Sequence, residues 1–207
     1  MEAETEATEE TVYPDELIVG SVTKMKGDFF TEMFGNDTAD IDVRALMHGY
    51  NLVNWDQAQG RYIFDPSVVT DVLVAVDDVG NKTYTLALAD DLQYSDGTPI
   101  TAWDYAFSIL LMMSPEVEEI GGSVRTMEYV VGYEEYINQE VPYLSGIRVP
   151  NDNLIAVTVK GEYLPFFYEL GLMDCNPYPI GVIAPGCQVE DRGQGIMITD
   201  IEDWEPE

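Results

Sequence analysis

The stretch that decides the fold runs from Asp90 to Met113, DDLQYSDGTPITAWDYAFSILLMM. Its 95–99 part, SDGTP, is a tight-turn sequence, because glycine accepts a positive φ and the Ser and Asp side chains can bond the nearby backbone. A helix is predicted directly afterwards, with Thr101 as N-cap and Asp104 facing the positive helix end. From Trp103 onward apolar residues recur on one helical face. The stretch therefore predicts a turn followed by a packed helix.

Strand patterns lie on both sides of this stretch. Residues 83–89, TYTLALA, put Tyr84, Leu86 and Leu88 on one side of a strand, against which we expect the helix to pack. A glycine-containing loop between 52–55 and 61–64 predicts a hairpin. Apolar runs and turn signals predict further strands at 17–22, 68–76, 154–159 and 196–198 and a helix at 40–50. They also predict a loop at 24–36 and a loop or short turn at 116–122.

Composition excludes several classes of protein. The chain has 207 residues, 46% of them apolar, which is enough for a packed core. Its net charge of −30 argues against binding to nucleic acid or anionic lipid, because affinity for phosphate depends on Lys and Arg. No apolar run is long enough for a membrane span, and residues 1–11, MEAETEATEET, have the composition of a flexible acidic leader.

The order of motifs resembles that of the extracellular solute-binding proteins of peptide and nickel ABC transporters. In that family a strand leads into an Asp-Gly turn and a helix of defined pattern. The resemblance extends over about 17–186, and its most specific matches are Lys82-Thr83-Tyr84-Thr85, Asp96-Gly97-Thr98-Pro99, Thr101-Ala102, Asp104 and Phe107-Ser108. It also implies short helices at 130–140 and 163–170 and a strand at 144–149.

The resemblance implies an α+β fold, a mixed β-rich domain with flanking helices that forms the N-terminal part of a two-lobed periplasmic-binding-protein-like fold. Because family members are much longer, we expect an N-terminal fragment. Residues 1–14 would be a flexible acidic leader, 15–187 the first-lobe strand plus the inserted small β-rich domain, and 188–207 an acidic C-terminal segment that ends at a truncation point.

The ligand-binding residues that the resemblance implies lie in two segments near the cleft between the lobes. The first follows the first strand and the second follows the 40–50 helix. The expected residues are Lys24, Met25, Gly27, Phe29, His48, Tyr50 and Asn51. Ordinary loop packing is the alternative. The carboxylate that meets a peptide's amino terminus belongs to the second lobe in this family, so we expect the fragment alone to bind ligand poorly.

The function implied is that of a substrate-binding component of an ABC importer, which captures a peptide or another small solute and delivers it to the transporter permease. The protein would be a non-enzymatic monomer at the cell surface or in the periplasm, held to the membrane only through a lipid anchor of the full-length protein. Two alternatives stay open: a non-catalytic cell-surface interaction module, and a secreted hydrolase. The sequence does not separate peptide, nickel and sugar ligands.

Chemical motifs are sparse. The chain has one histidine, His48, and no Gly-x-Ser-x-Gly sequence, so a hydrolytic triad lacks its parts. Cys175 and Cys187 with one distant His fall short of a tetrahedral zinc set, and no nucleotide-binding glycine loop is present; we expect no metal and no cofactor. In a secreted protein the two cysteines could form a disulfide, with two buried thiols as the alternative.

Overall fold

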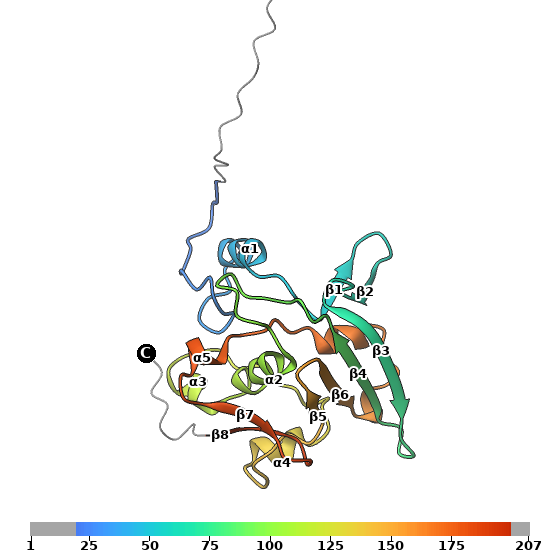
Figure 1. Cartoon of the computed structure of the whole chain (residues 1–207). Coiled ribbons are helices and arrows are strands. Elements are labelled where there is room, and N and C mark those ends of the chain that lie inside the picture. The colour runs from blue at the N-terminus through green and yellow to red at the C-terminus, as the bar shows by residue number, and fades with distance from the viewer. Residues whose placement is uncertain (1–19, 200–207) are drawn as a thin grey trace, which may run out of the picture.

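The computed structural model describes residues 20–199. Its central element is helix α2 (Ala102–Leu111), whose residues are all buried except Trp103. A helix that is apolar on every side belongs in the interior. Figure 1 shows α2 beside the main sheet, with the β7–β8 hairpin below it and α1 above. Its main contacts are with β5 to β8, so the strand carrying Tyr84 is not its principal partner as the sequence predicted.

The turn before α2 has the predicted chemistry. Gly97 has φ 86°, and the Asp96 carboxylate accepts a hydrogen bond from the Thr98 N–H at 2.8 Å. At the start of the helix the Asp104 carboxylate accepts from the N–H of Thr101 at 2.8 Å and from its hydroxyl at 3.0 Å. These bonds hold the chain in an extended conformation directly before its first helical turn.

The main sheet is antiparallel with the strand order β3-β4-β6-β5. The strands are β3 (Val69–Val76), β4 (Lys82–Leu88), β6 (Leu154–Val159) and β5 (Ile147–Asn151). Leu86 of β4 pairs with Ile155 of β6, and both side chains are fully buried on the same face. The predicted alternation of Tyr84, Leu86 and Leu88 is confirmed, because all three lie in the core.

Two hairpins complete the β structure. The predicted hairpin is β1 (Val53–Asp56) with β2 (Arg61–Phe64), which packs on the 3₁₀ helix η2 (Glu169–Met173). Gly171 lies so close to Tyr62 that an added Cβ would be 2.9 Å from its ring, so only glycine fits. The second hairpin joins β7 (Gln188–Asp191), which was not predicted, to the predicted β8 (Ile196–Thr199).

The β7–β8 hairpin is part of the packed body. Ile196 is fully buried and bridges to Leu144, and the Arg148 guanidinium lies 2.7 Å from the Asp191 carboxylate. The hairpin also contacts α2. Residues 188–199 therefore pack with the same core as the strands that precede them.

The remaining helices are short. They are α1 (Thr38–Met47), α3 (Pro115–Glu119), α4 (Tyr133–Ile137), α5 (Ile180–Ile183) and the 3₁₀ helix η1 (Gly161–Tyr163). A loop or short turn was expected at 116–122. Pro115 starts a short helix there, since proline is well accommodated at the first helical position. The helix predicted at 163–170 is wrong: the chain there is irregular between η1 and η2.

Two predictions near the N-terminus have mixed outcomes. The strand predicted at 17–22 lies largely outside the described residues, and its described end, 20–22, is not a strand. The helix predicted at 40–50 is confirmed as α1, but its apolar side chains Ile41 and Leu46 are exposed, and Asp40 is buried instead. The orientation of α1 is thus set by a polar contact, which is described below.

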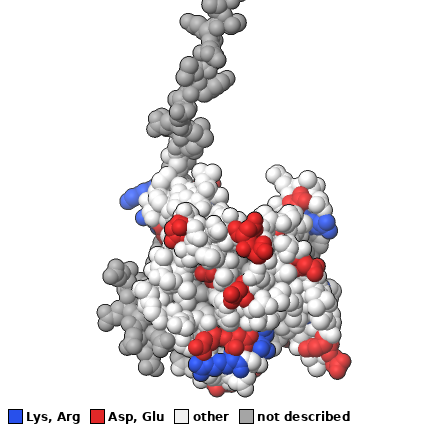
Figure 2. Space-filling model, viewed as in Figure 1, with Lys and Arg blue, Asp and Glu red and all other residues white. Residues whose placement is uncertain are grey.

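Charge is distributed over the surface. Figure 2 shows acidic side chains in small separate groups across one face, with basic side chains beside them at its lower edge. One such mixed pair is Lys160 with Glu134, whose side chain is 52% exposed. None of the helices among residues 20–199 is long and apolar enough to cross a membrane.

Candidate functional site

Three segments far apart in the sequence meet at one end of α1. They are the irregular segment 24–30, the segment 48–51 that follows α1, and residues 176–179, which follow η2. The His48 Nε2 atom lies 3.1 Å from the carbonyl oxygen of Phe29. The rings of Phe30, His48 and Tyr178 form a group with centroid separations of 5.9 to 6.5 Å. The two predicted segments are therefore in contact, and the third joins them.

A buried carboxylate fixes the first segment. Asp40, on the first turn of α1, accepts hydrogen bonds from the N–H groups of Lys26 and Gly27, each at 3.1 Å. Burial raises the pKa of Asp40, but these hydrogen bonds and the nearby charges of Arg44 and Lys26 outweigh burial and hold it below its ordinary value. Gly27 has φ 96°, a conformation that favours glycine. Asp40 faces inward because its carboxylate is the acceptor for these two backbone N–H groups.

Arg44, on α1, also stabilises the 24–30 segment through hydrogen bonds. Its guanidinium donates to the Asp28 carbonyl at 2.8 Å and also to the carbonyl of Gly35. The Asp28 carboxylate in turn accepts from the N–H of Thr31 at 2.9 Å and of Phe34 at 2.8 Å. The irregular backbone thus has its polar groups paired with side chains, which is what an ordered loop requires.

Helix α2 supports the other two segments. The Tyr105 hydroxyl donates to the Tyr50 carbonyl at 2.7 Å, and the Ser108 hydroxyl oxygen accepts from the Tyr178 N–H at 2.8 Å. Tyr50 has φ 65°, which is uncommon for a residue with a side chain and costs about 1–2 kcal/mol. Backbone held in such a conformation is concentrated at functional sites.

A polar hollow of about 270 Å³ lies on one side of His48. Its lining includes Arg44, Asn51, Asn176 and Tyr178. The Oδ1 atoms of Asn51 and Asn176 are both buried, and neither has a hydrogen-bond partner among residues 20–199. Because an unpaired buried acceptor costs roughly 1–3 kcal/mol, two in one hollow indicate a place that a hydrogen-bond donor would fill.

A more apolar hollow of about 220 Å³ lies on the other side of His48. Phe30, Met47, Tyr50 and Tyr94 are among its lining residues. Burial, and secondly the charge of Asp104, raises the pKa of Tyr94 far above its ordinary value, so its phenol is neutral. The two hollows together offer hydrogen-bond acceptors on one side and an apolar wall on the other.

Apolar side chains are exposed around these hollows. Each is at least 40% exposed: Met25, Phe30, Phe34, Ile41, Leu46 and Met47. Exposed apolar residues are normal when scattered, but contiguous ones mark a surface that meets a ligand or another protein surface. Of these six, Ile41 lines the polar hollow and Phe30 and Met47 line the more apolar one, so both hollows have exposed apolar side chains in their linings.

The predicted residues divide into three groups. His48, Tyr50 and Asn51 line the hollows. Phe29 contributes its carbonyl and Gly27 its N–H to the contacts that order the first segment. Lys24 and Met25 are exposed and line neither hollow. The site assignments themselves stay predictions.

Sequence reasoning missed the third segment. Asn176 and Tyr178 lie in the sequence Asn-Pro-Tyr-Pro at 176–179, within the stretch over which the resemblance extends. Two prolines limit the backbone there and leave polar and aromatic side chains in fixed directions. That motif was the available signal, but nothing local in it indicates contact with His48.

The possible disulfide between Cys175 and Cys187 stays a prediction. Both side chains are buried, and burial raises the pKa of Cys175 to about 12. Within the described part of the chain, no three His, Cys, Asp or Glu side chains gather as a metal site would require.

Comparison with known proteins gives a consistent result. No protein-family model matches the chain. It is 30% identical over 133 residues to the periplasmic oligopeptide-binding protein OppA of Escherichia coli, a match that covers 59% of the chain and 23% of that protein. It is 34% identical over 116 residues to OppA of Lactococcus lactis strain IL1403, covering 53% of the chain and 18% of that protein. The chain thus matches less than a quarter of either relative.

Solved structures share its fold. Lactococcal OppA, closed on an endogenous peptide, superposes with a TM-score of 0.55 at 24% identity, over 76% of this chain and 29% of that one. A periplasmic oligopeptide-binding protein from Borrelia burgdorferi superposes with a TM-score of 0.54 at 21% identity. That match covers 78% of this chain and 34% of the other. The predicted mixed fold of helices and sheet is confirmed. Sequence and fold together show that the chain is similar to a part of the oligopeptide-binding proteins.

Proposed function

We propose that the chain supplies one side of the solute-binding cleft of an ABC importer's binding protein and that its ligand is a peptide. The observation that carries this proposal is the pair of buried, unpartnered amide oxygens of Asn51 and Asn176 beside His48. A peptide backbone presents N–H donors that could pair with them, and the apolar hollow could take a side chain. Backbone pairing with roomy side-chain pockets tolerates variety of sequence.

We propose contacts for the residues expected from the sequence as well. His48, Tyr50 and Asn51 would border the ligand, with Phe29 and Gly27 shaping the adjoining loop and Lys24 and Met25 at the rim. The exposed apolar side chains around the hollows support this arrangement, because a cleft that closes on a ligand buries such a surface. The predicted boundary between 15–187 and 188–207 would then separate segments by sequence only, because residues 188–199 pack on the core of 15–187.

The proposed role involves binding without covalent chemistry. His48 Nε2 already contacts a backbone carbonyl, and the Cys175 thiol, with a pKa of about 12, is not a nucleophile at neutral pH. These observations support a binding protein over a hydrolase. We further propose a periplasmic or extracellular location, delivery to a transporter permease, and a lipid anchor in the full-length protein; the Escherichia coli relative is named as periplasmic.

One observation favours the interaction-module alternative. Trp55, Tyr62 and the three aromatics 166–168 form a partly exposed group on the β1–β2 side of the molecule, with neighbouring ring centroids 4.7 to 6.0 Å apart. Such a group could dock a partner. The relatives found by comparison are peptide-binding proteins, however, so peptide binding is the better supported function.

The test is titration of the ¹⁵N-labelled chain with Ala-Leu-Ala and with its N-methylated analogue, which lacks backbone donors. We expect weak, saturable shifts confined to 24–30, 48–51 and 176–179, with a dissociation constant above the micromolar range. The N-methylated peptide should bind at least tenfold more weakly, a difference of about 1.4 kcal/mol.

Two variants sharpen this test. Asn51→Leu and Asn176→Leu remove the acceptors at nearly constant size and should each reduce the shifts at least fivefold. Asn138→Leu, in an exposed position at the end of α4, is the matched control and should change nothing. Shifts that appear at other surfaces, or equal binding of both peptides, would overturn the proposal.

A further inference from the structure

A hollow larger than the two beside His48 lies away from the proposed peptide site. It has a volume of about 460 Å³ and is enclosed by α3, α4, the segment 139–142 and β8. None of its lining residues lines either hollow beside His48. Its volume falls within the roughly 300–1,000 Å³ of small-molecule sites.

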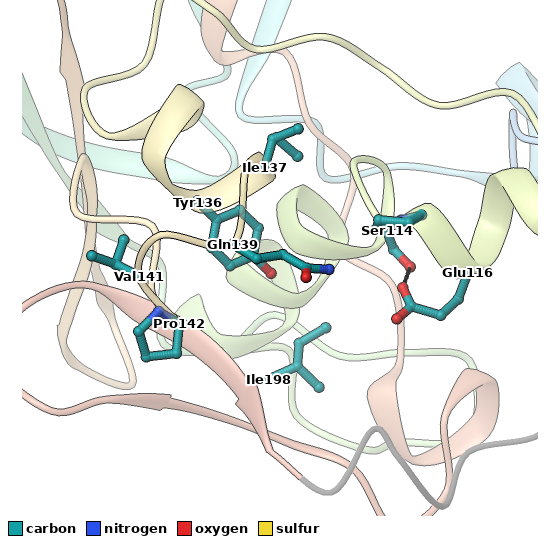
Figure 3. A pocket seen from close by; sticks show the side chains of 9 residues that line it. Ser114, Glu116, Tyr136, Ile137, Gln139, Val141, Pro142 and Ile198 are labelled. Atoms are coloured by element: carbon teal, nitrogen blue, oxygen red, sulfur yellow. Dashed lines mark hydrogen bonds between the residues drawn. The ribbon is translucent and has the colours of Figure 1, made fainter.

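Apolar residues make up much of the lining of this cavity. They are Pro115, Ile137, Val141 and Ile198, and Figure 3 shows Val141 across from the Ser114 and Glu116 side chains, with Ile137 and Ile198 on the two sides between them. These residues come from elements that are distant in sequence, and β8 is tied to the core through buried Ile196. The apolar wall is therefore preformed and could hold the hydrocarbon body of a ligand.

The opposite side carries one charge. The Ser114 hydroxyl donates to a Glu116 carboxylate oxygen at 2.5 Å, as Figure 3 shows. This bond orients the carboxylate and leaves its second oxygen available. Glu116 forms no ion pair with any residue in the range 20–199. It is the one carboxylate in the lining of this cavity, whose other polar side chains are Ser114, Tyr136 and Gln139.

Gln139 extends its amide over the cavity between these two sides (Figure 3). Its φ is 58°, a left-handed conformation that costs a residue with a side chain about 1–2 kcal/mol. Its N–H donates to the Tyr136 carbonyl at 3.0 Å, closing the turn after α4. A left-handed residue at this position is a common end of a helix, and the Glu140 N–H accordingly donates to the Glu135 carbonyl at 2.9 Å.

The phenol of Tyr136 adds no charge to the cavity. Burial, and secondly the charge of Glu116, raises its pKa to about 12, so it is neutral at physiological pH. The chain as a whole carries a net charge of −30, which raises the local concentration of cations and repels anions. A cationic ligand is thus favoured both by the whole molecule and by the one charged group in the cavity.

We propose that this cavity binds a small organic amine: the ammonium group pairs with Glu116 and hydrogen-bonds the Gln139 amide oxygen, and the aliphatic or aromatic body packs on Val141, Ile198 and Pro115. Carboxylate and amide oxygens are acceptors for the three donors of an ammonium. The site is independent of the peptide site, since the two share no residue.

The test uses 2-phenylethylamine and its neutral counterpart 2-phenylethanol with the whole chain at pH 7. We expect the amine to give saturable amide shifts at 114–116, 136–142 and 196–199, and the alcohol to bind at least tenfold more weakly. Raising the salt concentration should weaken the binding of the amine and leave the binding of the alcohol unchanged. Equal affinities for the two compounds would overturn the proposal without any variant being needed.

Glu116→Gln provides the second arm. Glutamine can still accept the Ser114 hydrogen bond through its carbonyl oxygen, so we expect the fold to persist, with amine affinity reduced at least tenfold. The matched control is Glu119→Gln, an exposed position on the same helix that does not line the cavity, and it should bind as the unaltered chain does. Unchanged amine binding by a folded Glu116→Gln protein would contradict the assignment. A negative result for amine binding would not affect the proposal of peptide binding, and a negative result in the peptide titration would not affect the proposal of amine binding.

Discussion

The Tyr105 hydroxyl, at the centre of the buried helix α2, donates a 2.7 Å hydrogen bond to the carbonyl oxygen of Tyr50, a residue with φ 65°. This contact joins the stretch that identifies the fold to a residue of the candidate site. The energetic cost of the Tyr50 conformation arises within its own backbone, whereas the hydrogen bond that stabilises this conformation comes from a core residue. The helix therefore has a role in positioning the site although none of its own side chains lines the two hollows beside His48.

Removing that hydroxyl tests the relationship. Tyr105→Phe leaves the Tyr50 carbonyl without its donor at nearly constant packing, so we expect the free energy of unfolding to fall by about 1–3 kcal/mol. Urea denaturation measures the change, and amide shifts should be largest at 49–52. Tyr168→Phe is the control. Because Tyr168 is 44% exposed, we expect this substitution to change the free energy of unfolding by less than about 0.5 kcal/mol. Equal effects of the two substitutions would disprove the supporting role of Tyr105.

Asp40 is expected to control the order of the 24–30 segment. Asp40→Asn removes the charge that accepts from the Lys26 and Gly27 N–H groups, so the segment should open more often. Trypsin should then cleave after Lys24 and Lys26 several-fold faster, as seen by mass spectrometry. Asp42→Asn, an exposed position on the same helix, should leave the cleavage rate unchanged. If both variants were cleaved at the original rate, Asp40 would not anchor the segment.

The pairing of Glu169 with Lys82 predicts a specific dependence of stability on pH. The Lys82 Nζ lies 2.6 Å from the Glu169 carboxylate, which also accepts from the Tyr84 hydroxyl. Burial raises the pKa of Glu169, but these two hydrogen bonds outweigh it and hold the pKa below the ordinary 4.5. A lowered carboxyl pKa contributes stability that is complete above the unfolded value and is lost as pH falls through the folded value.

Glu169→Gln should therefore lower the free energy of unfolding at pH 7 by about 1–3 kcal/mol and flatten its decline below pH 4.5. Denaturation curves from pH 3 to 7 measure both effects. Glu134→Gln breaks the pair with Lys160 at a 52% exposed side chain, and we expect it to cost no more than about 1 kcal/mol. Identical pH profiles for the unaltered chain and Glu169→Gln would show that this carboxylate is not the linked group.

Alkylation distinguishes the two states of the cysteines. With both sulfurs as buried thiols, and the pKa of Cys175 at about 12, the native chain should gain no label from iodoacetamide at pH 8 within minutes. Unfolded in urea without reductant, it should gain two labels. An unfolded chain that gains none would carry the disulfide that the sequence suggested.

Local physics explains most of what sequence reasoning predicted correctly. The strand with Tyr84 and Leu86, the Asp96-Gly97 turn and the start of α2 depend on alternation, turn chemistry and capping, which involve neighbours within a few residues. The two conspicuous errors concern elements whose conformation depends on distant contacts. One is the irregular 164–168 segment, and the other is the exposed apolar face of α1.

The sequence by itself thus showed the resemblance to peptide-binding proteins and predicted most of the strands and the two longest helices, together with two of the three segments that meet beside His48. Only the tertiary structure decided that Asn176 and Tyr178 join His48, that Asp40 faces inward, and that Glu116 and Gln139 border a separate cavity. The reason is physical: periodicity reports which face of an element is apolar, whereas the pairing of buried donors and acceptors from distant segments depends on how the whole chain packs.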